Sequence, residues 1–182
     1  MYKENTSQDG MVIVYTGNGK GKTTAALGVA LRAVGHGLKV CMVQFIKGEW
    51  HYGELNSLKN LEPDFELIVA GKGFIGIIDD DHPFGEHVRA ANIALNVVEQ
   101  KILLGCFDVI ILDEINYAVQ LGLLKLEDVL KIIQNRPKKV SLILTGNHAC
   151  EEIISLADLV TEMREIKHPY RKGIKAKKGI DF

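Results

Sequence analysis

The chain has 182 residues, of which 47% are hydrophobic and 25% charged, and its 22 Lys+Arg and 23 Asp+Glu give a formal net charge of -1. This composition excludes wholesale disorder, and the length predicts one domain over 1–182, with 1–10 flexible. The balanced charge argues against nucleic-acid binding. No apolar run approaches the roughly 20 residues of a membrane span, and the polar start is unlike a signal sequence, so a cytoplasmic protein without membrane contact is expected.

The first predicted elements form a βαβ unit. A β-branched run at 11–15 predicts a strand, a glycine-rich stretch follows it, and 23–34 has helical periodicity. Gly35 and Gly37 end this helix, and the continuous apolar run at 39–45 predicts a second strand that is buried on both faces.

Strands and helices continue to alternate along the chain. Further strands are predicted at 65–69, 108–112, 140–144 and 159–163, and the clearest further helices at 85–104 and 126–135. This alternation predicts an α/β fold with a mostly parallel central sheet that is covered on both faces. In such folds the functional crevice lies at the carboxyl ends of the strands.

The strongest chemical signal is a glycine-rich loop at 16–24, between the first predicted strand and helix. Backbone N–H groups of such a loop and the following helix N-terminus face an anion, Lys22 supplies a mobile cation and Thr23 offers a hydroxyl to Mg²⁺. Thr16 replaces the first glycine of the usual pattern, and a simple glycine-rich turn is the less favoured alternative. The predicted ATP-binding residues are Gly17, Asn18, Gly19, Lys20, Gly21, Lys22, Thr23 and Thr24.

A second signal is the apolar run at 109–112 that ends in Asp113 and Glu114. P-loop proteins place a carboxylate near the metal in this way, although an acid that caps the next element is an alternative. Either carboxylate can reach Mg²⁺ or Mn²⁺ while the other orients a neighbour. Together the two motifs predict a three-layer P-loop NTPase-like (RecA-like) fold that binds a nucleoside triphosphate.

At this point the sequence resembles the P-loop type corrinoid adenosyltransferases, the cob(I)alamin or cob(I)yrinic acid a,c-diamide adenosyltransferase family. The resemblance covers nearly the whole chain from Met11. It rests on the segments 17–24, 43–48 with 53–54, 112–114, 145–146, 157–164, 167–170, 173–176 and 178–182.

The resemblance implies transfer of the 5′-deoxyadenosyl group of ATP to Co(I) of a reduced corrinoid, with release of triphosphate, in adenosylcobalamin synthesis or salvage. The family's nucleotide is thought to lie reversed, with the loop holding the γ-phosphate end. Lys22, Thr23 and Glu114 would be the catalytic residues, and the metal would bind to Thr23 and to Glu114 in preference to Asp113. A separate reductant, such as a flavoprotein or reduced flavin, and a homodimer are also implied; which corrinoid is the acceptor stays open.

Two loop aromatics are candidates for the corrinoid site. Phe74 resembles the family's aromatic loop, which helps exclude the lower axial ligand of cobalt, and Trp50 lies in the other informative loop. A hydrophobic anchor under a loop is the ordinary alternative for either. The chain departs from the family pattern at Gly76, where a second aromatic is common, and at Asn147, where arginine is frequent.

The basic segment at 167–182 admits three interpretations: a solvated terminus, a nucleic-acid arm, or an element that closes over the active site. The resemblance favours the third, in which Arg171 and Lys175 would face phosphate or corrinoid. The main alternative to the whole functional hypothesis is an ATPase switch or motor module that forms ADP.

Overall fold

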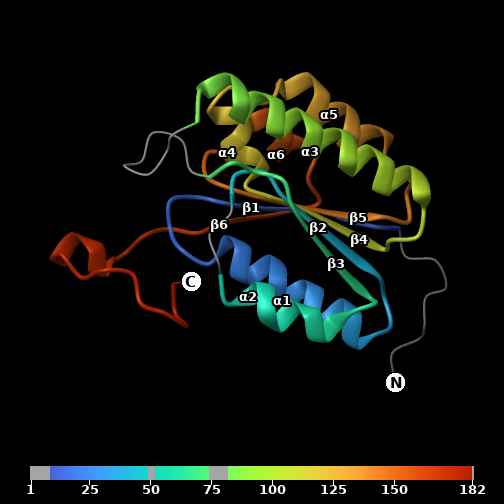
Figure 1. The fold of residues 1–182 in the computed structure, drawn as a ribbon. Helices are drawn as coiled ribbons and strands as arrows, with labels where there is room; N and C mark the ends of the chain where they lie inside the picture. Colours follow the sequence, from blue (N-terminus) through green and yellow to red (C-terminus); the bar gives the residue numbers. More distant parts are fainter. Residues whose placement is uncertain (1–8, 49–51, 74–81, 182) are drawn as a thin grey trace.

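The computed structural model describes residues 9–48, 52–73 and 82–181. Its centre is one six-stranded sheet in the order β3-β2-β4-β5-β1-β6, and every neighbouring pair is parallel (Figure 1). The strands are β1 (Val12–Thr16), β2 (Val40–Gln44), β3 (Phe65–Val69), β4 (Val109–Asp113), β5 (Ser141–Thr145) and β6 (Leu159–Glu162). The predicted mostly parallel sheet is confirmed.

Helices cover the sheet on both sides, which gives the predicted three layers (Figure 1). One side carries α1 (Lys22–Gly35) and α2 (Glu54–Ser57), with the short 3₁₀ helix η1 (Leu58–Leu61) after α2. The other side carries α3 (Phe84–Leu104), α4 (Ile115–Gln120), α5 (Leu126–Asn135) and α6 (Glu151–Ser155). A second 3₁₀ helix, η2 (Pro169–Lys172), follows β6.

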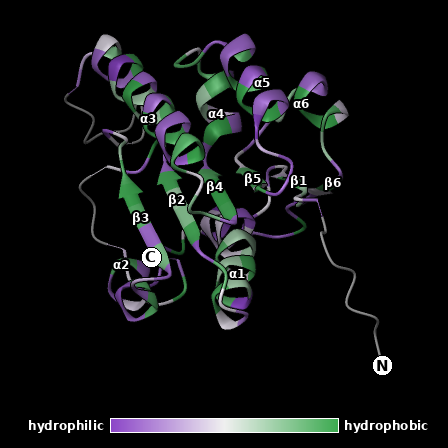
Figure 2. Ribbon diagram, turned by 90° about the vertical axis from the view of Figure 1, so that its right-hand side faces the viewer, coloured by the Kyte–Doolittle hydropathy of each residue, from purple (hydrophilic) through white to green (hydrophobic). Residues whose placement is uncertain are grey.

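Two of the inner strands, β2 and β4, are buried on both faces, as their continuous apolar sequences predict. Alternate side chains enter separate cores: Cys41 and Val43 pack on the α3 side, whereas Val40 and Met42 pack with Ala26 of α1. Figure 2 shows the apolar residues concentrated in these strands, with polar residues on the outer sides of the helices. Within the described ranges no helix has both the length and the apolar character of a membrane span.

β3 has its predicted bounds, whereas each of the other five strands differs from prediction by one residue at one or both ends. Asp113 is still paired with Gln44 in the ladder, so β4 extends one residue beyond the apolar run that marks it in the sequence. At the end of β6 the chain leaves the strand early, because the Met163 carbonyl accepts a hydrogen bond from Gly19 at 2.7 Å. Polar contacts at the carboxyl edge, which hydrophobicity does not report, set these boundaries.

Candidate active site

The glycine-rich loop joins β1 to α1 at the carboxyl edge of the sheet. Gly17 and Gly21 have φ values of 92° and 112°, in the left-handed region that favours glycine. Lys22, the first residue of α1, donates hydrogen bonds from its ammonium to the carbonyls of Gly17 and Gly19, each at 2.8 Å. Burial lowers the pKa of Lys22, and the charges of Glu114 and Asp113 oppose this shift.

The segment after β6 supports the outer side of this loop. The Gly17 position is enclosed, since a Cβ built there would lie 2.4 Å from the Met163 carbonyl oxygen. The Asn18 side chain accepts a hydrogen bond from the Glu165 backbone N–H at 3.1 Å. The shape of the P-loop therefore depends on residues near the other end of the chain.

Replacing Gly17 with alanine is expected to destabilise the protein by about 1–3 kcal/mol and to weaken ATP binding. The new methyl group would meet backbone at 2.4 Å, at a φ of 92° that strains any side chain. Thermal unfolding and calorimetric titration with Mg²⁺ and ATP would measure both effects. Gly28→Ala is the matched control, since a Cβ at this helical position meets nothing within 4 Å; equal stability of the two variants would contradict the prediction.

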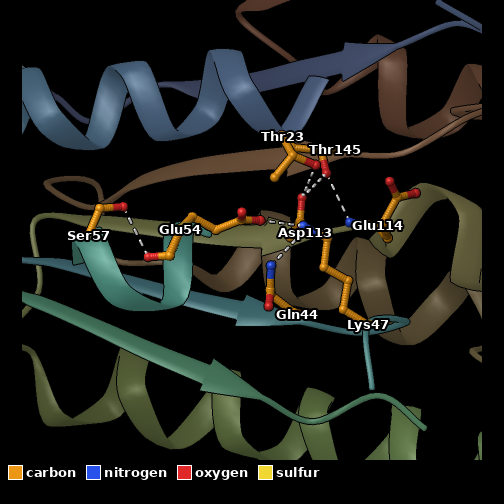
Figure 3. Close-up of polar contacts among 8 residues, drawn as sticks. All are labelled: Thr23, Gln44, Lys47, Glu54, Ser57, Asp113, Glu114 and Thr145. Atoms are coloured by element: carbon orange, nitrogen blue, oxygen red, sulfur yellow. Dashed lines mark hydrogen bonds and ion pairs between the residues drawn. The ribbon is translucent and has the colours of Figure 1, made fainter. Parts of the chain in front are cut away.

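Asp113 is the polar centre of the site (Figure 3). Its side chain is fully buried, and its Oδ1 accepts hydrogen bonds from the hydroxyls of Thr23 and Thr145, both at 2.8 Å. Its Oδ2 accepts a hydrogen bond from the Gln44 amide at 3.1 Å. One carboxylate thus ties the P-loop helix to β2, β4 and β5, and the structure brings the two sequence motifs together.

Glu114 follows in a different orientation, as expected for adjacent residues at a strand end. Its φ of 66° is unusual for a non-glycine residue, and its backbone N–H donates to the Thr145 hydroxyl at 2.9 Å. The side chain borders the cleft beside the P-loop. Burial, then the Asp113 charge, raises the pKa of Glu114 to about 7, while Lys22 and Lys47 oppose the shift.

This pKa predicts a specific pH dependence in the metal-free protein. The folded pKa of about 7 lies above the ordinary value of 4.5, so folding disfavours the ionised form of Glu114. Ionisation of Glu114 therefore lowers the free energy of unfolding by on the order of 3 kcal/mol as the pH rises from about 4.5 to 7. Glu114→Gln has no carboxylate to ionise, so its free energy of unfolding minus that of wild type should increase from about pH 4.5 to 7 in denaturant titrations. A difference that does not change with pH would contradict the raised pKa of Glu114.

A cleft of about 1150 Å³ opens over the P-loop and is large enough for a nucleotide. Glu114, Tyr117 and Asn147 border it on the sheet side, so the position where the family often has arginine does face the site. The other lining residues are Asn18–Thr24, Leu27, Lys47, Tyr52–Glu54, Ser57, Ala176 and Gly179–Asp181.

The basic C-terminal segment reaches this cleft. Asp181 forms an ion pair with Lys20 of the P-loop and also accepts a hydrogen bond from the Lys177 backbone N–H at 2.7 Å. The bond to Lys20 lowers the pKa of Asp181. Arg171 instead pairs with Glu165 at 2.6 Å. Ala176 and Gly179–Asp181 line the cleft, whereas neither Arg171 nor Lys175 does.

Sequence reasoning assigned no role to Lys47, Tyr52 and Glu54, which the structure places at the cleft. The Lys47 ammonium lies 3.0 Å from a carboxylate oxygen of Glu54 and 4.6 Å from the centre of the Tyr52 ring. Two of these residues belong to segments that carry the family resemblance, and Lys47 follows a strand that ends beside Asp113. The family resemblance of 43–48 is the sequence signal at this lysine, whereas its place beside Asp113 is seen only in the structure.

The two aromatics predicted to bind the corrinoid, Trp50 and Phe74, lie outside the described residues, as does Gly76. Their roles stay predictions.

The residues predicted to bind the metal suit a hard cation. Thr23, Asp113 and Glu114 supply hydroxyl and carboxylate oxygens, the donors that Mg²⁺ prefers. Across the part of the chain that the structure describes, no three His, Cys, Asp or Glu side chains group to hold a metal. Mg²⁺ usually takes one or two carboxylates and completes its shell with phosphate oxygens and water.

A strand–loop–helix unit with a lysine at the helix start, beside a strand that ends in a buried aspartate, defines a P-loop nucleotide-binding protein of the α/β class. The chain is similar in fold to a KaiC-like protein from Pyrococcus horikoshii, with a TM-score of 0.50 at 16% identity over 90% of this chain and 77% of the other.

The chain belongs to the family described as ATP:corrinoid adenosyltransferase BtuR/CobO/CobP, whose model matches residues 8–182. It is 40% identical over 173 residues to a corrinoid adenosyltransferase of Escherichia coli K12, covering 95% of this chain and 86% of that protein. It is 41% identical over 174 residues to the corrinoid adenosyltransferase CobA of Salmonella typhimurium, with the same coverage. The resemblance read from the motifs is confirmed.

Proposed function

We propose that this protein is an ATP:corrinoid adenosyltransferase, which moves the 5′-deoxyadenosyl group of ATP to Co(I) of a reduced corrinoid and releases triphosphate, in adenosylcobalamin synthesis or salvage. Family membership and relatives of about 40% identity over most of the chain support this activity. The observation that carries it is the P-loop joined through Thr23 to the buried Asp113, beneath an open cleft. No observation favours the ATPase alternative.

The chemistry is a displacement at the 5′ carbon of the ribose. The cobalt of the substrate supplies the electron pair for the new Co–C bond, and the C–O bond to the triphosphate breaks with its electron pair going to oxygen. The protein must orient the carbon and stabilise the leaving anion. Lys22 and the P-loop N–H groups would bind that anion, and the loop would hold the γ-phosphate end.

Mg²⁺, or Mn²⁺, would be held by Thr23 and Glu114 and would neutralise charge on the triphosphate. Asp113 would act mainly by fixing the Thr23 hydroxyl, since it already accepts hydrogen bonds from Thr23, Thr145 and Gln44. Glu114 is the better ligand because it borders the cleft, whereas Asp113 is fully buried.

Further parts of the proposal come from the sequence and from the family resemblance. Phe74 and Trp50 would contact the corrinoid, a separate flavoprotein or reduced flavin would supply the electron that forms Co(I), and the protein would work as a homodimer in the cytoplasm as one domain.

Phosphorus NMR of an anaerobic reaction tests the activity. The protein is incubated with Mg²⁺, ATP and a chemically reduced corrinoid, and triphosphate is expected only when the corrinoid is present. ADP and phosphate formed with or without corrinoid would contradict the proposed function and leave the P-loop assignment intact.

A further inference from the structure

Lys47 has an environment unlike that of a surface lysine. Its side chain is 11% exposed, and its ammonium lies 3.0 Å from Glu54 Oε1 and 3.9 Å from Asp113 Oδ2. The centre of the Tyr52 ring lies 4.6 Å from the same ammonium, within the range of a cation–π contact. A cation is therefore held beside the polar centre of the site by residues from two sides of the cleft.

The position of Lys47 relative to Thr23 is the decisive geometry. Thr23 donates to one oxygen of Asp113, and the Lys47 ammonium lies beside the other oxygen of the same carboxylate (Figure 3). The 3.9 Å separation is too long for a hydrogen bond, and among the described residues Glu54 accepts one of the three ammonium donors. An anion bound at Thr23 would lie within reach of the remaining donors.

We propose that Lys47 is a second triphosphate-binding lysine, which faces the leaving group from the loop after β2, whereas Lys22 does so from the start of α1. Glu54 holds the Lys47 ammonium in place until the anion binds. The N–H that donates to Glu54 then becomes available to the anion. The inference rests on the proposed function, because it assigns Lys47 to the triphosphate product of that reaction. It adds a cation to a site in which Asp113 and Glu114 otherwise repel the phosphates.

The competing explanation is that Lys47 only neutralises Asp113 and braces Glu54. The two explanations differ in what Glu54 does. In a brace, loss of either partner weakens the site, so changes at Lys47 and Glu54 act in the same direction. In the proposed role Glu54 competes with the phosphates for the ammonium, so the two changes act in opposite directions.

The test is calorimetric titration of inorganic triphosphate with Mg²⁺, together with adenosine binding followed by NMR. Lys47→Met is expected to weaken triphosphate binding at least about tenfold and to leave adenosine binding within about twofold of wild type. Lys47→Arg should retain most of the triphosphate affinity, and Glu54→Gln should bind triphosphate at least as tightly as wild type. Thermal unfolding checks that each variant is folded.

Lys101→Met is the matched control. Lys101 also pairs with a glutamate, Glu66 at 2.6 Å, and also lies over an aromatic ring, Phe107 at 5.6 Å, but it does not line the cleft. Its variant should bind triphosphate as wild type does. Wild-type affinity in Lys47→Met, equal loss of both probes, or weakening by Glu54→Gln would each overturn the inference. Wild-type protein that binds no triphosphate would overturn the proposed function itself.

Discussion

Replacing Lys22 with alanine is expected to reduce corrinoid-dependent triphosphate release by about 10²–10³-fold. Lys22 is the cation at the start of α1, and the carbonyls of Gly17 and Gly19 already direct its ammonium into the loop. Removing it deletes a preorganised charge from the site where the leaving group gains negative charge. The rate of triphosphate formation, followed by phosphorus NMR at saturating ATP, measures the loss.

The control for this experiment is Lys131→Ala. Lys131 is exposed on α5, pairs with Asp128 at 2.9 Å, and does not border the cleft. The Lys131→Ala variant should release triphosphate at the wild-type rate. Undiminished release by Lys22→Ala would show that the glycine-rich loop does not bind the reacting phosphates.

The second large effect is expected from Asp113→Asn, which should lower activity by about 10²-fold or more while changing stability little. The asparagine carbonyl can still accept from Thr23 and Thr145, and its amide can face Gln44 if the Gln44 amide turns over. That turn is inexpensive because Gln44 Oε1 has no hydrogen-bond partner among the described residues. The expected cost in stability is therefore about 1 kcal/mol. Activity falls because a neutral carbonyl accepts from the Thr23 hydroxyl more weakly than a carboxylate does, and that hydroxyl is the proposed metal ligand.

Asp108→Asn is the comparison for this variant. Asp108 precedes the same strand, β4, at its opposite end, and its carboxylate accepts a hydrogen bond from the Lys39 backbone N–H at 2.8 Å. Activity and thermal unfolding should be measured for both variants. If Asp113→Asn is largely unfolded under the assay conditions, unfolding explains its loss of activity, and Asp113 acts as a structural residue only.

The sequence predicts most of the fold because the signals are local. Continuous apolar runs mark β2 and β4, and the helix at 126–135 has the predicted bounds in the structure. The order of the strands is not local information, since it depends on how the cores on the two sides of the sheet pack. Hydrophobicity likewise misplaces the end of β4, where Asp113 stays in the ladder for reasons of hydrogen bonding.

The candidate site is predictable to the extent that its motifs are contiguous. Sequence spacing identifies two motifs, Gly17 to Thr24 and the pair Asp113 and Glu114, and the structure brings them together. Lys47 and Glu54 do not, because an ion pair seven residues apart across a loop has no sequence periodicity. Asp181 and its partner Lys20 are even further apart in the sequence, and only the fold brings them together.

The place of β1 in the sheet has a consequence for synthesis on the ribosome. β1 comes first in the chain but pairs only with β5 and β6, the last two strands of the described sheet, and Met163 completes the P-loop that β1 begins. A nascent chain must hold β1 without a strand partner until almost all of the sheet has been translated. Such a chain leaves the apolar edges of β1 unpaired until β5 and β6 have emerged, and the contact that supports the P-loop forms only after Met163 has been translated.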